Sequence, residues 1–461
     1  MSTLMSVGEL ARVVAPKDVT TELQGDSRIG FSSVSTDSRS LTTGALFVAL
    51  TGERFDGHDH VAQAKEKGAC AALVNRIVDV DIAQIIVPDA RRALGLAAAN
   101  WRARFALPVI AVAGSNGKTT VTQMIASILA QAHGDKGRLA TRGNLNNDIG
   151  VPLMLWQLSK HHRAAVFEVG MNHPGEIAYL AGLVQPTVAV VTNAQREHQE
   201  FMRSVEATAF ENGEVIAALS DDGVAVLPAD DACASVWRQF AGTRRVIDFA
   251  IDASAVVTAT FSNAGDGIAV SMATPDGLID VRIAAIGLHD VRNALAAAAA
   301  CIAIGIPSET IAAGLTAWRQ VDGRGVRLKM SDGVLIDDSY NANPDSVRAA
   351  IDVLAAAPSP RVLVLGEMGE VGSRGPEFHH EVGAYARECG IDSLFAIGPM
   401  TRETVRAFGE SARYFDDIDV LIAALQIHGV ANRTVLVKGS RFMRMERVVQ
   451  ALSTQQFEGV H

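Results

Sequence analysis

The sequence is poor in cysteine, and the cysteines that it has are scattered. Cys70, Cys233, Cys301 and Cys389 are the whole set among 461 residues, and no two of them form a C-x-x-C pair. Zinc sites and disulfide scaffolds use closely spaced or numerous cysteines, so both kinds of site are disfavoured. We expect free thiols in a reducing compartment.

The sequence also lacks an excess of basic residues. It has 41 lysines and arginines against 51 aspartates and glutamates, which gives a net charge of −10. Nucleic acids and anionic membranes need a basic surface, so we expect no nucleic-acid partner. Phosphorylated small molecules remain candidate ligands, because backbone amides and single lysine or arginine side chains can hold them.

Long hydrophobic runs are missing as well. The longest apolar stretch, residues 294–304, is too short to cross a bilayer. Residues 1–14 contain Glu9 and no basic stretch followed by an apolar run, so we expect no signal peptide. We therefore expect a soluble, cytoplasmic protein without membrane insertion, and we expect it to be a monomer.

The residues that are present have the composition of an ordinary globular protein, with 48% hydrophobic and 20% charged residues. Short β-branched runs alternate with alanine- and leucine-rich helical runs, which predicts an α/β fold with largely parallel sheets. We infer three domains, at residues 1–88, 89–321 and 322–461. Alternating apolar and polar residues at 253–285 predict a small antiparallel addition to the middle domain.

Polar residues stand at the ends of several predicted strands. The strands are expected at residues 165–169, 188–192, 334–336, 362–365, 394–397 and 435–437. Asn193, Asp337, Asp338, Glu367 and Lys438 follow or close them. Ligands of open α/β sheets bind outside the carboxyl ends of the strands, so the unusual side chains fall where such a fold uses them.

A glycine-containing loop lies between a predicted buried strand at residues 109–113 and an amphipathic helix. The loop reads Gly114, Ser115, Asn116, Gly117, Lys118, Thr119, Thr120. Backbone amides and the helix N-terminus attract phosphate, Lys118 reaches the terminal phosphates of ATP, and the Thr119 hydroxyl can bind Mg²⁺. The full Walker pattern has glycine where this chain has Val112, so a glycine turn with a surface lysine is the alternative; the flanking strand and helix favour ATP.

Two further residues are candidate metal ligands. Glu168 closes a predicted strand near the loop, where a carboxylate can hold Mg²⁺ directly or through water, although an isolated strand-end glutamate is more often solvent-facing. His198 lies in a polar loop, which alone is typical of a surface residue. The pairs His161-His162 and His379-His380 lack zinc-binding spacing, so we interpret them as exposed or capping residues.

Taken together, these motifs and their order resemble the Mur ligase family of bacterial cell-wall synthesis. The resemblance runs from about Ser35 to Val448. The matching segments are residues 35–39, 44–50, 55–58, 114–120, 143–152, 167–177, 287–296, 323–324, 336–346, 365–370 and 437–441.

The resemblance implies a role for each domain. A small N-terminal α/β domain would hold the UDP end of the substrate through Thr36, Ser38 and Arg39. A central P-loop ATPase domain with a mostly parallel sheet would bind ATP and Mg²⁺. A C-terminal Rossmann-like α/β domain would close over ATP and bind the amino donor.

The resemblance also implies roles for single residues. Asn146 and Asn147 would lie near the muramyl substrate, and Asn293 would bind the adenine. Thr119, Glu168 and His198 would be the Mg²⁺ ligands. Arg324, Asp338 and Asn341 would close over the nucleotide. The residues expected to carry catalysis are Lys118, Glu168, His198 and Arg324.

The segment D-D-S-Y-N-A-N-P at residues 337–344 resembles the branch of the family that adds D-alanyl-D-alanine. It implies an ATP-dependent, ADP-forming ligase that joins D-alanyl-D-alanine to UDP-N-acetylmuramoyl-tripeptide through an acyl phosphate. The alternatives are a ligase that adds the third residue, a folylpolyglutamate synthetase-like ligase, or a nucleotide-binding switch without ligase activity. The third peptide residue, meso-diaminopimelate or lysine, and the general base for the amine stay open.

One position departs from the family pattern. Fourteen residues after its metal-binding histidine, the family usually has a carbamylated lysine that supports a second Mg²⁺, and this chain has Asn212 there. An asparagine cannot be carbamylated and carries no charge. Our hypothesis is that Glu211, Glu214 or water replaces the lysine, or that the second metal site is weak.

Overall fold

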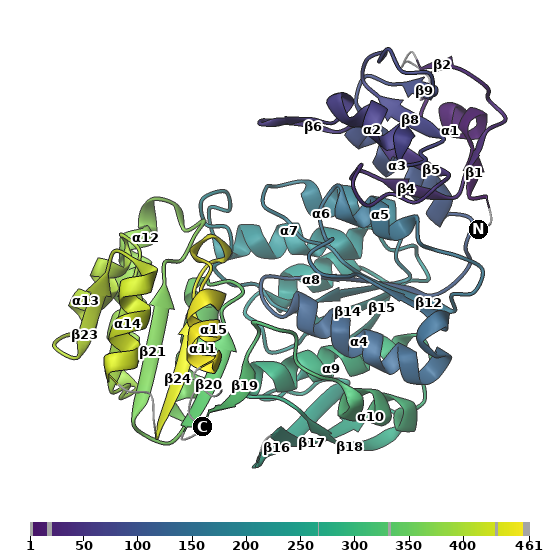
Figure 1. Cartoon of the computed structure of the whole chain (residues 1–461). Coiled ribbons are helices and arrows are strands. Elements are labelled where there is room, and N and C mark those ends of the chain that lie inside the picture. The colour runs from purple at the N-terminus through teal and green to yellow at the C-terminus, as the bar shows by residue number, and fades with distance from the viewer. Residues whose placement is uncertain (1–2, 16–20, 266, 331–332, 429–431, 455–461) are drawn as a thin grey trace, which may run out of the picture.

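The computed structural model describes residues 3–15, 21–265, 267–330, 333–428 and 432–454. In this part of the chain, helices and strands form an N-terminal, a central and a C-terminal unit, each with its own sheet (Figure 1). The α/β fold predicted from the sequence is confirmed. The domain limits at 88/89 and 321/322 stay predictions. Among the described helices, none is long and apolar enough to cross a membrane.

The N-terminal unit is a small α/β sheet with the strand order β2-β9-β8-β5-β4. Strand β2 runs antiparallel to β9, and the other neighbours are parallel. Two short antiparallel pairs, β1 with β3 and β6 with β7, lie beside it. The elements are β1 Met5–Ser6, α1 Val7–Val13, β2 Glu22–Gln24, β3 Gly30–Phe31, β4 Ser33–Ser35, β5 Ala45–Val48, β6 Thr51–Gly52, β7 Phe55–Asp56, α2 Val61–Glu66, β8 Ala71–Val74, β9 Ala83–Ile86 and α3 Ala90–Arg102.

The central unit has the strand order β11-β12-β10-β13-β14-β15-β16-β17-β18. Neighbours are parallel as far as β16, and β16, β17 and β18 are antiparallel, which confirms the predicted antiparallel addition. The elements are β10 Val109–Ala113, α4 Lys118–His133, β11 Arg138–Ala140, α5 Gly150–Leu155, β12 Ala164–Glu168, α6 Glu176–Val184, β13 Val188–Val191, α7 Val205–Ala217, β14 Val224–Pro228, α8 Ala234–Ala241, β15 Arg245–Ala250, β16 Val257–Ala264, β17 Gly267–Thr274, β18 Gly277–Ile283, α9 Leu288–Ala303 and α10 Ser308–Ala317.

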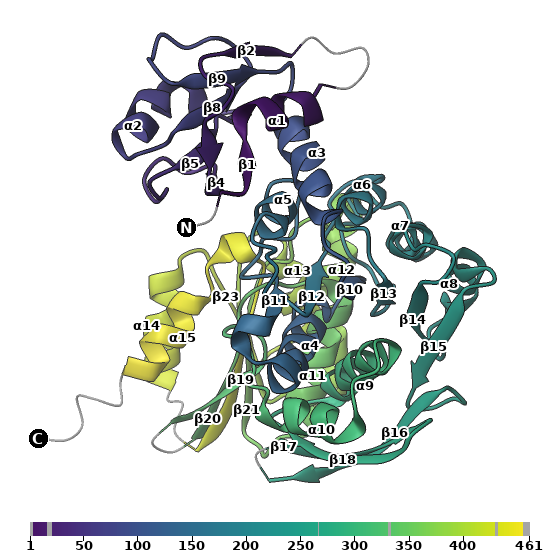
Figure 2. The ribbon, with the colours of Figure 1, turned by 90° about the vertical axis from the view of Figure 1, so that its right-hand side faces the viewer.

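Helix α3 connects the N-terminal unit to the central unit (Figure 2). It packs against α5 and α6, and its last turn is anchored by two polar side chains. The Trp101 indole donates to the Leu158 carbonyl at 3.1 Å, and the buried Arg102 guanidinium donates to the Val184 carbonyl at 2.9 Å. Because these buried donors find carbonyl partners, the helix end is fixed on the central unit.

The C-terminal unit has the strand order β19-β20-β24-β21-β22-β23. Strand β19 is antiparallel to β20, and the other neighbours are parallel. The elements are β19 Val326–Met330, β20 Gly333–Asp338, α11 Pro344–Ala355, β21 Arg361–Gly366, α12 Gly375–Glu388, β22 Ser393–Ile397, α13 Thr401–Phe408, β23 Ala412–Phe415, α14 Ile418–His428, β24 Arg433–Lys438 and α15 Glu446–Thr454.

The cores follow from strands that are buried on both faces. Every residue of β10 is buried, as expected for a central parallel strand covered by helices on both sides. Apolar side chains of α4 and α9 pack on one face of the central sheet, and those of α6 and α7 pack on the other. Such a layered sheet leaves the carboxyl ends of its strands as the place where loops and ligands meet.

The paired histidines on α12 differ from the prediction. His380 is exposed, but His379 is fully buried. Its Nε2 accepts a hydrogen bond from the Met368 amide at 3.1 Å, and its Nδ1 lies 2.7 Å from the Gly375 carbonyl. The prediction that both are exposed or capping residues is wrong for His379, which ties α12 to the loop after β21.

Candidate active site

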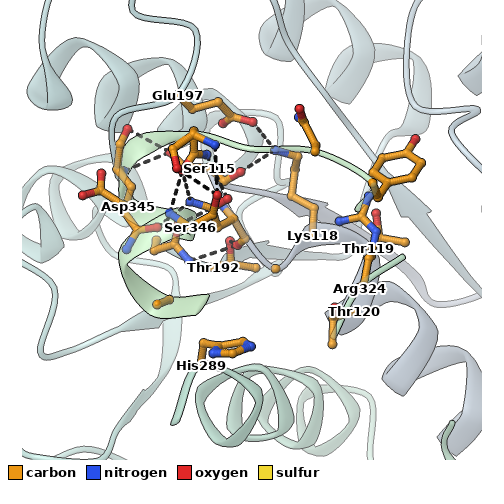
Figure 3. Close-up of a pocket in the computed structure, with 18 of the residues that line it drawn as sticks. Ser115, Lys118, Thr119, Thr120, Thr192, Glu197, His289, Arg324, Asp345 and Ser346 are labelled. Atoms are coloured by element: carbon orange, nitrogen blue, oxygen red, sulfur yellow. Dashed lines mark hydrogen bonds and ion pairs between the residues drawn. The ribbon is translucent and has the colours of Figure 1, made fainter. Parts of the chain in front are cut away.

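A cavity of about 1080 Å³ opens between the central and C-terminal units. Its lining comes from the loop after β10, the ends of β12, β13 and β24, and the first turns of α9 and α11. Figure 3 shows part of this lining, including Lys118 of the loop, His289 of α9 and Asp345 of α11. The predicted residues that line it are Ser115, Asn116, Gly117, Lys118, Thr119, Thr120, Asn146, Asn147, Glu168, His198, Asn293, Arg324, Asp338 and Asn341. Gly114 is buried and is not among the lining residues.

The phosphate loop, residues 114–120, ends in a bare helix N-terminus. Gly117 is the N-cap of α4 and has a φ of 85°, and no side chain of the described residues caps the helix there. A side chain on Gly117 would place its Cβ 2.3 Å from Asn293 Oδ1, so only glycine lets the loop lie against Asn293. The free amides and the helix dipole together favour an anion at this point.

The Lys118 ammonium is held at the mouth of the loop. Its Nζ donates to the carbonyls of Gly114 and Ser115 at 2.5 and 2.9 Å, and it forms an ion pair with Glu197 at 2.8 Å (Figure 3). Both charged side chains are largely buried, with exposed fractions of 14% and 13%. The three N–H donors of this ammonium are thus engaged by protein acceptors, and a phosphate arriving at the loop competes with Glu197 for it.

The predicted metal ligands are only partly brought together. Thr119 Oγ1 donates to Glu168 Oε2 at 2.8 Å, and Asn146 Nδ2 donates to Glu168 Oε1 at 2.7 Å. Glu168 is buried, and its backbone amide donates to Thr141 Oγ1 at 2.9 Å. Hydroxyl and carboxylate oxygens suit Mg²⁺, which uses few protein ligands and takes the rest from phosphate and water.

His198 is paired with carboxylates. Its Nδ1 lies 2.7 Å from Glu370, which reaches over from the C-terminal unit, and its Nε2 lies 3.5 Å from Glu197. Burial lowers the pKa of His198, but hydrogen bonds and charge from Glu197 and Glu370 outweigh burial and raise the pKa to about 9. An imidazolium has no lone pair for a metal, and within the described part of the chain no three His, Cys, Asp or Glu residues form a metal-binding group.

Asn212 and Glu211 have structural partners. Asn212 is buried on α7, and its Oδ1 accepts the Gly114 amide at 3.0 Å. Glu211 accepts the amides of Gly175 and Ile177 at 2.9 and 3.0 Å, so its carboxylate caps α6. Both oxygens of Glu211 thus already accept backbone amides, and the hypothesis that Glu211 replaces the missing lysine as a metal support stays a prediction.

The C-terminal candidates surround the far side of the cavity. Lys438 is buried at the end of β24; its Nζ forms an ion pair with Asp338 at 2.6 Å and donates to the Asn341 carbonyl at 2.9 Å. The Arg324 guanidinium lies 4.3 Å from the centre of the Tyr340 ring, a cation–π contact. Lys438 thus neutralises Asp338 and fixes the loop after β20. The sequence placed Lys438 at the end of a strand but did not predict these partners.

Besides the pair of His198 with Glu370, two further sets of contacts join the central unit to the C-terminal unit, and the sequence did not indicate either of them. Asn343 Nδ2 donates to Asn116 Oδ1 at 2.9 Å. Arg196 forms ion pairs with Asp345 and Glu381, each at 2.6 Å. These partners lie far apart in the chain, so only the fold brings them together.

The N-terminal candidates do not reach this cavity. Thr36, Ser38 and Arg39 are absent from its described lining. Ser38 is buried and donates to Gln63 at 2.7 Å, and the exposed Arg39 forms an ion pair with Asp37 at 2.9 Å. The Ser38 hydroxyl and the Arg39 guanidinium thus have partners within the protein, and their predicted role as substrate donors stays a prediction.

Comparisons with known proteins decide the family. The Mur ligase family catalytic domain matches residues 30–102, the Mur ligase middle domain matches residues 112–301, and the Mur ligase glutamate ligase domain matches residues 323–441. The UDP-N-acetylmuramoyl-tripeptide–D-alanyl-D-alanine ligase of Escherichia coli strain K12 is 42% identical over 436 residues, covering 94% of this chain and 95% of the relative. The chain belongs to the Mur ligase family.

Two solved structures have the same fold as this Mur ligase over almost its whole length. The crystal structure of MurF from Acinetobacter baumannii has a TM-score of 0.88 at 34% identity, and the match covers 98% of this chain and 99% of that one. The structure of MurF from Thermotoga maritima in complex with ADP has a TM-score of 0.82 at 24% identity, covering 93% and 98% of the two chains, and this likeness shows the fold alone.

Proposed function

We propose that this Mur ligase joins D-alanyl-D-alanine to UDP-N-acetylmuramoyl-tripeptide with cleavage of ATP to ADP and phosphate, in the cytoplasmic synthesis of peptidoglycan precursors. The Escherichia coli relative carries this activity in its name and covers nearly the whole chain. The observation that carries the proposal is structural. The phosphate loop and Asp338, Tyr340 and Asn341 of the segment at residues 337–344 line one cavity.

The chemistry begins with phosphoryl transfer. The terminal carboxylate of the tripeptide attacks the γ-phosphorus of ATP, the bond to the bridging oxygen breaks, and ADP leaves. Two anions approach each other in this step, so neutralisation of charge governs its barrier. Lys118 and Arg324 line the cavity and supply positive charge, and the amides at the start of α4 hold phosphate oxygens.

The second step forms the amide. The free amine of D-alanyl-D-alanine attacks the carbonyl carbon of the acyl phosphate, inorganic phosphate leaves, and the nitrogen gives up a proton. The C-terminal unit, held to the central unit through the contacts of Asn343 with Asn116 and of Asp345 with Arg196, would bring the amino donor to the acyl carbon.

The residues present fit a bound Mg²⁺. Thr119 and Glu168 would hold it together with phosphate oxygens, since their oxygens already lie within 2.8 Å of each other in a buried position. When bound, Mg²⁺ neutralises negative charge on the transferring phosphoryl group. His198 stays a prediction as a third ligand, because its imidazole must first lose the proton that Glu197 and Glu370 stabilise.

We retain the predicted roles of Asn146 and Asn147 near the muramyl substrate, of Asn293 at the adenine, and of Asp338 and Asn341 over the nucleotide. All of them line the cavity. The predicted UDP-binding residues Thr36, Ser38 and Arg39 remain in the proposal, with Ser38 and Arg39 exchanging Gln63 and Asp37 for the ligand.

The decisive experiment measures ADP release with UDP-N-acetylmuramoyl-tripeptide, with and without D-alanyl-D-alanine. Tripeptides ending in meso-diaminopimelate and in lysine are assayed in parallel. We expect ADP release that requires all three substrates. ADP release with glutamate and a folate instead would support the folylpolyglutamate synthetase-like alternative, and nucleotide binding without any amino-donor-dependent ADP would support a switch.

A further inference from the structure

Asn212 contacts the phosphate loop from behind. The residue is 1% exposed, lies in the middle of α7, and is not among the residues that line the cavity. Its Oδ1 accepts the Gly114 amide at 3.0 Å, while its Nδ2 is buried without a hydrogen-bond partner in the described part of the chain. The Asn212 side chain thus makes one hydrogen bond, to the Gly114 amide. Its second polar group stays buried and unsatisfied, which is unfavourable in free energy.

Gly114 is the residue of the loop whose conformation most needs such a restraint. Its φ is +128°, a region that residues with side chains rarely adopt, and a Cβ there would lie 2.1 Å from Thr192 Oγ1. Its amide donates to Asn212, and its carbonyl accepts the Lys118 ammonium at 2.5 Å. The two peptide groups on either side of one α-carbon therefore connect Asn212 with Lys118.

Helix α7 is a firm support for this contact. The indole of Trp237 on α8 donates to the Ala209 carbonyl of α7 at 2.9 Å. Glu211 caps α6, and Gly213 packs so closely on Phe240 that a Cβ there would lie 2.5 Å from the ring. Because α7 is fixed on both sides of residue 212, the position of the asparagine amide is fixed as well.

We propose that Asn212 is a positioning residue for phosphoryl transfer, which sets the Gly114 peptide and through it the point where the Lys118 ammonium enters the phosphate site. This inference rests on the proposed role of the loop in binding ATP. In this role Asn212 orients the Gly114 peptide by a hydrogen bond, which its neutral amide can form without a metal ion.

The first test measures hydrogen exchange of the Gly114 amide in protein labelled with ¹⁵N-glycine. Asn212→Leu removes the acceptor at similar volume, and Asn212→Asp keeps an acceptor oxygen at the same position. We expect Gly114 exchange to accelerate at least about tenfold in Asn212→Leu and to stay near the wild-type rate in Asn212→Asp. Unchanged exchange in Asn212→Leu would overturn the proposal. The matched control is Thr208→Val, which changes a buried hydroxyl on the same helix that bonds only within that helix.

The second test is a double-mutant cycle on the dissociation constant for ATP. Asn212→Leu is expected to weaken ATP binding about tenfold in the wild-type background and to have little effect in Lys118→Met, because its influence passes through Lys118. Equal effects in both backgrounds would overturn the proposal. In turnover assays KM for the tripeptide should stay unchanged, whereas a general loss of structure would alter every constant.

Both tests can be read even if ligase turnover is absent, because exchange and nucleotide binding do not need the acceptor substrates. A protein that binds ATP with this coupling but releases no ADP would refute the proposed ligase activity and leave the positioning role standing.

Discussion

Asn116 and Asn343 exchange hydrogen bonds between the phosphate loop and the C-terminal unit. Asn343 Nδ2 donates to Asn116 Oδ1 at 2.9 Å, and Asn116 Nδ2 lies 3.3 Å from Asn343 Oδ1. The same Asn343 caps α11, since its Oδ1 accepts the Ser346 amide at 2.8 Å. One side chain therefore both starts a helix and joins the two units at the site where ATP phosphates are proposed to bind.

Asn343→Ser should separate these two roles. Serine is a good N-cap, so the free energy of unfolding should change by less than about 0.5 kcal/mol, whereas its short side chain cannot reach Asn116. We expect the arrangement described here, with Asn343 against Asn116, to be less populated and KM for ATP to rise several-fold. X-ray scattering with and without nucleotide, together with steady-state kinetics, measures both effects. Asn343→Ala, which loses the cap too, should be less stable by about 1 kcal/mol.

Lys118→Met should abolish turnover without unfolding the protein. The ammonium is bonded to Gly114, Ser115 and Glu197, and its charge is proposed to neutralise the transferring phosphoryl group. We expect kcat to fall by at least about 10²-fold, with a far-UV circular dichroism spectrum like that of the wild type. Lys136→Met, an exposed lysine just beyond the other end of α4, is the control and should keep full activity. Turnover above a tenth of the wild-type rate in Lys118→Met would contradict the proposed catalytic role of Lys118.

Arg196→Ala should loosen the junction between the central and C-terminal units. It leaves Asp345 and Glu381, both partly buried, without the guanidinium that bridges them. We expect a loss of about 2 kcal/mol in the free energy of unfolding, and a higher KM for ATP. The control is Arg374→Ala, which breaks an exposed pair with Glu377 and should change neither quantity measurably. Equal behaviour of the two variants in urea unfolding would contradict the junction role.

His379 should make the C-terminal unit sensitive to acid. Burial lowers the pKa of His379 below its ordinary value near 6.5, and it outweighs the Gly375 carbonyl and the charge of Glu367, which both raise the pKa. A depressed pKa of a base in the folded state means that the unfolded chain binds the proton more readily. The contribution of neutral His379 to the free energy of unfolding is thus complete above about pH 6.5. It is lost as the pH falls from there through the pKa of His379 in the folded state.

Urea unfolding between pH 5 and 8 tests this dependence. The wild type and His380→Gln, which alters the exposed neighbour, should lose stability on acidification with the same slope. His379→Gln should be less stable at pH 7.5 but show a flatter dependence below pH 6.5. A wild-type slope in His379→Gln would assign the acid sensitivity to other groups.

The local patterns of the sequence were sufficient for much of the fold. Residues 109–113 predicted the buried strand β10, and the apolar spacing after them predicted α4. The predicted strand at residues 165–169 corresponds to β12 with a one-residue shift. These predictions succeed because a strand buried on both faces needs a continuous apolar run, and a helix buried on one face needs apolar residues at helical spacing. Both patterns can be recognised within a short stretch of sequence.

The loop at Gly114 to Thr120 and the carboxylate of Glu168 could likewise be found from the sequence, because their chemistry depends on residue type and on adjacent secondary structure. The partners of His198, Asn212 and Glu211 could not. Their contacts join residues that are separated in the chain by tens to more than a hundred positions, and no local pattern records such distances.

The sequence by itself determined the α/β class, the phosphate loop with Lys118, and the resemblance to the Mur ligases. Only the tertiary structure decided that Glu211 caps a helix, that Asn212 holds Gly114, and that Asn343 meets Asn116. The physical reason is that secondary structure follows from short-range periodicity, whereas hydrogen-bond partners of buried polar groups are set by which elements pack together.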